Sequence, residues 1–311
     1  MPSPDPPDAT RRYRVQHVTR YAYAESVELA QHLLHLEPRA LAPRQSTTWS
    51  LAVVPEPSVM ARHLDSFGNP VTYMAFQEPH GSLQVTSAIE VEVRQGRAID
   101  LAATPPWEEM AAAIAAAPHE AARRAAAFAY ASPRIPPLAG LHDYAAASFA
   151  PKRPIGEAAR DLVSRIHRDF VFDPVATTVA TPLATVFQSR RGVCQDLAHV
   201  ALSGLRGLGL AARYVSGYLR TIPPAGAPRL RGSDASHAWI SVWCGGDDWL
   251  DLDPTNDQAS ALDYVTVGWG RDYDDVSPAR GVLFGGGSHT LAVMVDVEPV
   301  GPLRSDPVLP G

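Results

Sequence analysis

A loop in the middle of the chain reads Ser189-Arg190-Arg191-Gly192-Val193-Cys194-Gln195-Asp196 and leads directly into an apolar pattern of helical period. The apolar positions of that pattern are Leu197, Ala198, Ala201, Leu202 and Leu205. This spacing predicts a helix whose first turn contains Cys194. The backbone N–H groups of a first turn are unpaired and the helix dipole is positive there, so the position favours a thiolate. Because the thiolate is the nucleophilic form, we interpret Cys194 as a candidate nucleophile.

A predicted hairpin over residues 236–253, with its turn at 244–248, supplies an imidazole and a carboxylate. Alternation along the two strands places His237 on the same face as both Asp251 and Asp253. Cross-strand neighbours on one face are close enough for an imidazole–carboxylate hydrogen bond. The spacing leaves the choice between the two aspartates open. A proline follows Asp253 and marks the end of the strand, which favours Asp253.

These three residue types are those that acyl transfer by a thiol requires. The Cys194 thiolate would attack an amide or thioester carbonyl, His237 would protonate the leaving amine, and Asp253 would orient the imidazole. The backbone N–H of Cys194 would hold the oxyanion together with one side-chain donor. Gln188 and Gln195 are the candidate donors, and nothing in the sequence chooses between them.

Each of these residues also has a structural interpretation when it is taken alone. A cysteine at a helix start is often a small buried apolar residue, and a single histidine on a strand is usually a packed one. An Asp-Pro-Thr sequence is often only a turn. We expect Cys244 to be structural, and His199 as well, because its position on the helix points away from Cys194. The combination, rather than any single residue, supports the catalytic interpretation.

The composition narrows the class of protein. Among the 311 residues, 46% are hydrophobic and 19% are charged, as in ordinary globular proteins, and a net charge of −6 gives no case for binding nucleic acid. We expect no membrane span and, because the proline-rich start has no apolar stretch typical of a secretory signal, a cytoplasmic location. The two cysteines, Cys194 and Cys244, are too few for a four-cysteine zinc site, and we expect neither a metal nor a disulfide.

The chain divides by composition and pattern. Segments of alternating apolar and polar residues, separated by turn sequences, predict a small β domain. The alanine-rich region that follows is divided by Pro118 and predicts two short helices. A proline-containing loop is expected at 222–235 and a last strand at 291–297. The predicted organisation is a disordered tail (1–11), a β-sandwich domain (12–100), a helical connector (101–150), the catalytic core (151–300) and a second tail (301–311).

Taken together, several blocks resemble bacterial transglutaminase-like proteins. The core blocks are Arg191-Gly192-Val193-Cys194-Gln195-Asp196-Leu197-Ala198-His199, Ala212-Arg213-Tyr214-Val215-Ser216-Gly217-Tyr218, Ser236-His237-Ala238-Trp239 and Trp249-Leu250-Asp251-Leu252-Asp253-Pro254-Thr255-Asn256. Further blocks, including Asp65-Ser66-Phe67-Gly68-Asn69, resemble the β domain that precedes this core in many bacterial members. Nearly all of residues 12–300 is covered.

The resemblance implies a papain-like α+β core with the nucleophile on a helix packed against an antiparallel sheet. It implies catalytic roles for Cys194, His237 and Asp253, in preference to Asp251, and no organic cofactor. Family activities include protein cross-linking, deamidation, and peptide or isopeptide hydrolysis. We favour a thiol hydrolase acting on a peptide or protein. The alternatives are a transglutaminase that joins glutamine carboxamides to amines, and an inactive binding or assembly module.

Overall fold

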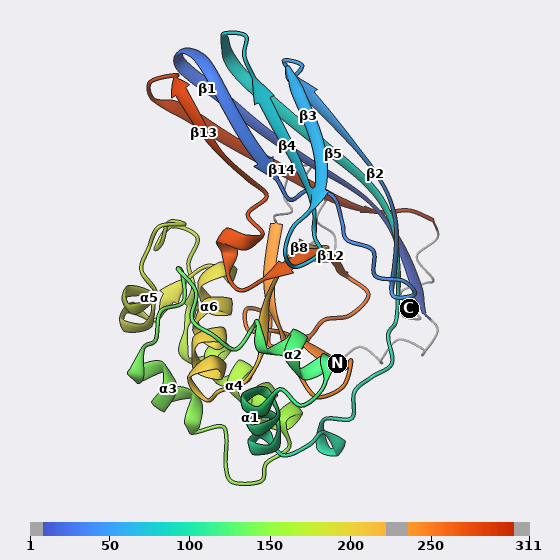
Figure 1. The fold of residues 1–311 in the computed structure, drawn as a ribbon, viewed down its shortest axis with the longest axis vertical. Helices are drawn as coiled ribbons and strands as arrows, with labels where there is room; N and C mark the ends of the chain where they lie inside the picture. The colour runs from blue at the N-terminus through green and yellow to red at the C-terminus, as the bar shows by residue number, and fades with distance from the viewer. Residues whose placement is uncertain (1–8, 222–235, 302–311) are drawn as a thin grey trace, which may run out of the picture.

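The computed structural model describes residues 9–221 and 236–301. The predicted loop 222–235 lies outside the described residues, as does most of each predicted tail, 1–11 and 301–311. Within the described part, a long sheet forms one end of the molecule, and helices packed on a second sheet form the other (Figure 1).

A long first strand, β1 (Thr10–Leu34), forms the centre of a seven-stranded antiparallel sheet. The other strands are β2 (Gln45–Val54), β3 (Val59–Leu64), β4 (Pro70–Phe76), β5 (His80–Arg94), β13 (Ala279–Gly285) and β14 (His289–Pro299). The registers show that β4 and β5 pair with successive parts of one edge of β1. β13 and β14 pair with successive parts of its other edge. β2 pairs with β5, and β3 pairs with β4. β1 therefore holds the sheet together. Because it begins at Thr10, the predicted N-terminal tail, 1–11, is two residues too long.

The long strands are all interrupted at one level of the sheet. β1 shifts register between Ala22 and Val27, residues 77–79 separate β4 from β5, and residues 286–288 separate β13 from β14. The sheet curls there, and side chains from both sides of the break, such as Val27 and Leu83, share one apolar core. The β domain is thus one antiparallel sheet that curls over, so that its two halves pack on a shared core as in the predicted sandwich.

The last two strands correct a predicted boundary. The strand expected at 291–297 lies within β14. The sequence pattern, however, places all of residues 151–300 in the catalytic core. β13 and β14 instead pair with β1 and complete the sheet of the β domain. Alternation identifies a strand and its buried face, but it carries no information about which strand is the partner.

The alanine-rich region forms η1 (Leu101–Ala103), α1 (Trp107–Ala116), α2 (Glu120–Ala126) and α3 (Ala139–Ala146). α1 and α2 are separate helices on either side of Pro118, as predicted. Ala145 lies so close to Gly204 that a Cβ on that glycine would come within 2.7 Å. The region therefore packs into the core that follows it. None of the described helices is both long and apolar enough to cross a membrane.

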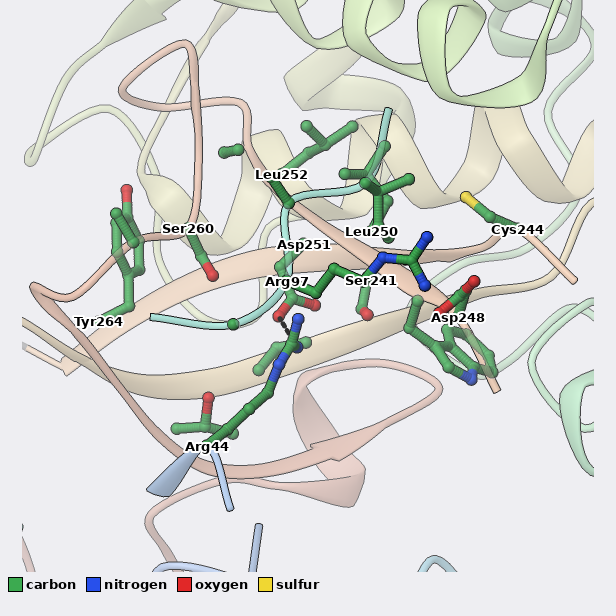
Figure 2. A pocket seen from close by; sticks show the side chains of 18 of the residues that line it. Arg44, Arg97, Ser241, Cys244, Asp248, Leu250, Asp251, Leu252, Ser260 and Tyr264 are labelled. Atoms are coloured by element: carbon green, nitrogen blue, oxygen red, sulfur yellow. Dashed lines mark ion pairs between the residues drawn. The ribbon is translucent and has the colours of Figure 1, made fainter. Parts of the chain in front are cut away.

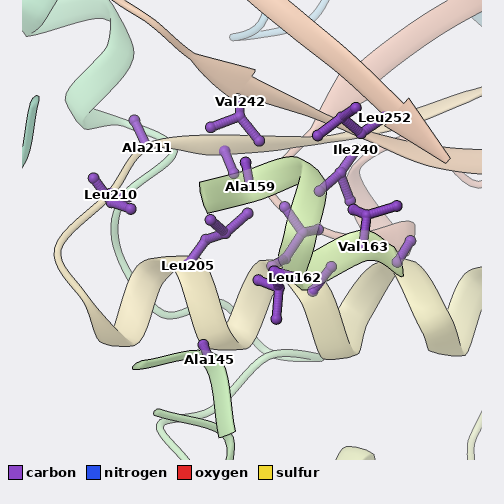
Figure 3. Close-up of a cluster of buried hydrophobic side chains, with 14 of the residues drawn as sticks. Ala145, Ala159, Leu162, Val163, Leu205, Leu210, Ala211, Ile240, Val242 and Leu252 are labelled. Carbon is purple, nitrogen blue, oxygen red and sulfur yellow. The ribbon is translucent and has the colours of Figure 1, made fainter. Parts of the chain in front are cut away.

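Helix α6 (Cys194–Gly207) begins at the predicted residue and is almost fully buried. With α4 (Ile155–Asp169) it packs on a five-stranded antiparallel sheet in the order β11-β10-β9-β8-β12. These strands are β8 (Ala212–Leu219), β9 (Ser236–Trp243), β10 (Trp249–Asp253), β11 (Gln258–Ala259) and β12 (Tyr264–Gly270). Figure 3 shows Leu205 of α6 and Leu162 of α4 in the same cluster as Ile240 and Val242 of β9. The predicted papain-like α+β core is confirmed.

Asn69, fully buried, joins the β domain to this core. Its carboxamide donates to the Trp269 carbonyl oxygen (2.8 Å) and accepts from the Trp269 N–H (3.1 Å). Arg39 donates to the same carboxamide, and Asp65 accepts from it. β12 shifts register beside this contact, and a Cβ on Gly268 would lie 2.8 Å from Asn69 Oδ1. The Asn69 amide thus serves as a backbone partner for an irregular part of β12.

Replacing Asn69 with Ala should lower the free energy of unfolding by about 2–4 kcal/mol, because the N–H and C=O of Trp269 both lose a partner. Gly268→Ala should destabilise the natural protein through its clash with Asn69, and should cost clearly less in the Asn69→Ala background. Urea unfolding of the four proteins measures both effects, with Gln77→Ala as an exposed control. Strictly additive losses would contradict this account of the contact.

Candidate active site

The β9–β10 hairpin brings His237 and Asp253 together. Leu252 pairs with Ile240, so Asp253 lies diagonally across the two strands from His237 and on the same face. The His237 Nε2 and Asp253 Oδ2 atoms are 2.7 Å apart. The predicted imidazole–carboxylate pair is therefore present in the structure.

Asp253 has no exposed surface and its carboxylate is surrounded by donors. Oδ1 accepts from the backbone N–H groups of Thr255 (2.8 Å) and Asn256 (3.2 Å). Oδ2 accepts from His237, from the Tyr264 hydroxyl (2.6 Å) and from the Asn256 carboxamide (2.7 Å). Burial alone would raise the pKa of Asp253, but these donors outweigh it and the pKa lies below its ordinary value. Asp253 is therefore held as a carboxylate.

His237 lies between this carboxylate and Cys194. Burial lowers the pKa of His237, but hydrogen bonds to Asp253 and to Cys194 outweigh burial and raise it to about 10. Since Nε2 is engaged by Asp253, Nδ1 is the ring nitrogen left to interact with Cys194. The ring also stacks on Trp239, with centroids 6.1 Å apart, and lies the same distance from Tyr264. Asp253 thus fixes Nε2, and the two neighbouring rings fix the plane of the imidazole.

Cys194 is the first residue of α6 and is partly exposed, and the chain is anchored both before and after it. Before it, β7 (Arg191–Gly192) pairs with β6 (Val171–Phe172). After it, the Asp196 carboxylate accepts from the Val193 N–H at 2.9 Å. A Cβ on Gly192 would come within 2.6 Å of that carboxylate, so this turn requires a glycine. Sequence reasoning missed Asp196, although an acid three residues after a helix N-cap is a known capping signal.

The two oxyanion candidates lie in different settings. Gln188 is exposed on α5 (Leu183–Ser189), while Gln195 is buried in the first turn of α6. Neither position identifies it as the donor, so that choice stays a prediction.

The remaining candidates lie away from the thiol–imidazole pair. Asp251 approaches Arg44 at 4.0 Å rather than His237. Cys244 is buried, its S–H donates to the Val242 carbonyl, and burial raises its pKa to about 12. His199 is buried and accepts from the Tyr273 N–H at 3.2 Å, and burial lowers its pKa to about 3. Both side chains are buried with partners inside the fold, and their structural role stays a prediction.

The described residues include no group of three or more histidine, cysteine or acidic side chains placed to hold a metal ion. The residues brought together here are a thiol, an imidazole and a carboxylate. Tyr264 and Asn256 also donate to the Asp253 carboxylate. Of these two residues, only Asn256 lies in one of the sequence blocks that resemble the family. Tyr264 comes from another strand, so no local pattern connects it to Asp253.

An α+β fold with a thiol at a helix start beside an imidazole–carboxylate pair is characteristic of the papain-like class. Two family patterns match the chain: the bacterial transglutaminase-like N-terminal region over residues 13–92 and the transglutaminase-like superfamily over residues 143–254. The chain belongs to the transglutaminase-like superfamily.

Three similar proteins frame this assignment. The uncharacterized protein Rv2569c of Mycobacterium tuberculosis is 40% identical over 306 residues, covering 94% of this chain and 95% of its own. A protein-glutamine gamma-glutamyltransferase of Pseudomonas aeruginosa is 32% identical over 102 residues, covering 30% of this chain and 15% of its own. A crystal structure described as a "Putative Cysteine Protease from Cytophaga hutchinsonii" has a TM-score of 0.73 at 16% identity, covering 96% of this chain and 93% of its own. The last comparison shows the shared fold.

The two cysteines should differ sharply in reactivity. At pH 7, iodoacetamide should alkylate Cys194 more than about 10²-fold faster than Cys244, because Cys194 is partly exposed beside His237 while Cys244 is buried with a raised pKa. Peptide mass spectrometry of a time course gives both rates. Comparable rates would remove the basis for regarding Cys194 as activated.

The His237 ring should titrate near pH 10, and at a clearly lower pH in Asp253→Asn, where the carboxylate charge is lost. Since the folded-state pKa exceeds the unfolded value of about 6.5, the bound proton stabilises the fold fully below pH 6.5. That contribution disappears as the pH rises through 10. NMR of the histidine Cε1–H signals measures the titration, and the His199 signal, which should stay constant above pH 5, is the internal control.

Proposed function

We propose that the protein is a Cys-His-Asp acyl-transfer enzyme that hydrolyses peptide, amide or isopeptide bonds. The observation that carries the proposal is the placement of His237, with one ring nitrogen on a fully buried carboxylate and the other left for Cys194. An imidazole held in this way can keep a thiolate–imidazolium pair and can move a proton between the sulfur and a substrate. Membership of the superfamily supports the same chemistry.

In the first half-reaction, the Cys194 sulfur forms a bond to the substrate carbonyl carbon. The carbonyl oxygen becomes an oxyanion, to which the backbone N–H of Cys194 donates at the start of α6. The C–N bond then breaks as His237 passes its proton to the leaving amine, which departs and leaves a thioester. Asp253 keeps the ring oriented and stabilises its charged form.

In the second half-reaction, the acceptor attacks the thioester. A water molecule gives its proton to His237, and its oxygen bonds to the carbonyl carbon. The C–S bond breaks, so an acid is released and the thiolate–imidazolium pair is restored. An amine in place of water would give a new amide by the same steps, so the triad alone does not distinguish hydrolysis from cross-linking.

We favour hydrolysis because water is always available and no amine-binding motif is evident in the sequence. The similarity to a protein-glutamine gamma-glutamyltransferase over 102 residues favours cross-linking as the second candidate. The inactive-module alternative has less support, because all three reactive groups are present. A cytoplasmic location, a peptide or protein substrate, and no binding to nucleic acid or membrane remain part of the proposal.

Exposure to a peptide mixture should leave an acyl group on Cys194 that mass spectrometry detects after acid quenching. Cys194→Ala should lower turnover by at least about 10⁴-fold, while Cys244→Ala should keep it within a few fold of the natural protein. Circular dichroism verifies that both variants fold. Equal losses of activity in the two variants would contradict the assignment.

The acceptor is identified in the same assay by adding a fluorescent primary amine to a glutamine-containing peptide. A hydrolase releases a free acid and leaves the label unincorporated. Incorporation of the label at a rate exceeding acid formation would replace hydrolysis with cross-linking as the function.

A further inference from the structure

A cavity of about 790 Å³ lies against the five-stranded sheet, where Ser241, Asp251 and Tyr264 line it (Figure 2). Its other walls are the start of β2 and the segment 93–105, which connects β5 to α1. Cys194 and His237 do not line it. The volume is typical of sites that hold small organic ligands.

The feature that distinguishes this cavity is Arg213, on β8. Its guanidinium carbon lies 3.3 Å from the ring centroid of Trp249 and 4.4 Å from that of Trp269, so the group is held by stacking on two rings. No hydrogen bond or ion pair joins Arg213 to a described residue, and Asp251 attracts it only at longer range. Its Nε is buried, so a ligand would be met by the terminal nitrogens of this partly exposed side chain. Stacking leaves the in-plane N–H groups of a guanidinium available, and these match a planar oxyanion such as a carboxylate.

Other arginines of the cavity already have acceptors. Arg160 donates to both the side chain and the backbone carbonyl of Asp257. Arg94 donates to Glu92 at 2.8 Å. Arg44 faces Asp251 at 4.0 Å, the ion pair that Figure 2 marks with a dashed line. Among the described residues, Arg97 and Arg213 of this cavity have no acceptor, and Arg213 differs from Arg97 in being held in place by two aromatic rings.

The mixture of charged and apolar walls favours an organic anion as the ligand. Figure 2 shows Arg97 reaching into the cavity from the segment after β5, beside Asp251 and Asp248. The arginines attract an anion and these acids repel it, so the discrimination against a small inorganic anion has to come from the apolar walls. The rings of Trp249 and Trp269, together with Leu250, add apolar wall that suits the organic part of a ligand.

We propose that this cavity binds a carboxylate-bearing organic ligand, whose carboxylate accepts from Arg213 and whose apolar part packs on Trp249 and Trp269. The carboxylate could be that of a free acid or the end of a peptide, and both present the same chemistry. Tyr264 also lines the cavity, and its hydroxyl donates to Asp253, so the occupied site would lie next to the proposed triad. The proposal does not depend on the proposed function.

Calorimetric titration with N-acetylleucine, which imitates a peptide carboxyl end, tests the site, and tryptophan fluorescence follows the same binding. We expect saturable one-to-one binding, and at least tenfold weaker binding of the uncharged N-acetylleucinamide and of inorganic phosphate. Hexanoate serves as the free-acid arm: affinity equal to that of N-acetylleucine supports a free acid, and weaker binding supports a peptide end. Amide or phosphate binding as tight as that of N-acetylleucine would overturn the proposal.

Arg213→Gln should weaken N-acetylleucine binding at least tenfold. The matched control is Arg94→Gln, which also removes a cation from the cavity. Because the Arg94 guanidinium already has Glu92 as its acceptor, this substitution should change binding less than twofold. Arg97→Gln, on an exposed side chain, should weaken binding about threefold and does not depend on the fold tolerating a change at Arg213. Equal effects of the Arg94 and Arg213 substitutions, or no saturable binding by the natural protein, would refute the site.

Discussion

The buried carboxylate of Asp253 is the constraint on which the rest of the core depends. A charge without exposed surface has to be compensated by the protein, because an uncompensated one costs several kcal/mol. The donors come from three places: His237 on β9, Tyr264 at the start of β12, and the backbone just after β10. These elements must therefore assemble in one arrangement, and that arrangement orients the imidazole toward the start of α6.

The β domain takes part in this arrangement through β12. That strand begins at Tyr264, which bonds to Asp253, and near its other end Trp269 is held by Asn69 of the β domain. β12 is thus secured at one end by the candidate active site and at the other by a neighbouring domain. An apolar layer in which Val15 and Val265 are both buried reinforces the contact along its length. The β domain is therefore an integral support of the core.

Features with a local signature were predictable from the sequence. The start of α6 at Cys194 follows from apolar periodicity, and the His237–Asp253 pair follows from the short hairpin that carries both residues. Contacts between distant segments were not predictable, because neither propensity nor periodicity specifies a partner. The Tyr264 hydrogen bond, the Asn69 contact and the pairing of residues 279–299 with β1 all belong to this second group.

The pairing of β1 with β13 and β14 has a consequence for how the protein is made. Residues 10–34 leave the ribosome early, whereas residues 279–299 emerge only after the whole core has been synthesised. During translation, one side of β1 exposes unpaired backbone groups for the time needed to add more than two hundred residues, as an edge strand does. The nascent chain thus carries an open β edge until β13 and β14 have been added, and this is the stage of synthesis at which it is most open to aggregation.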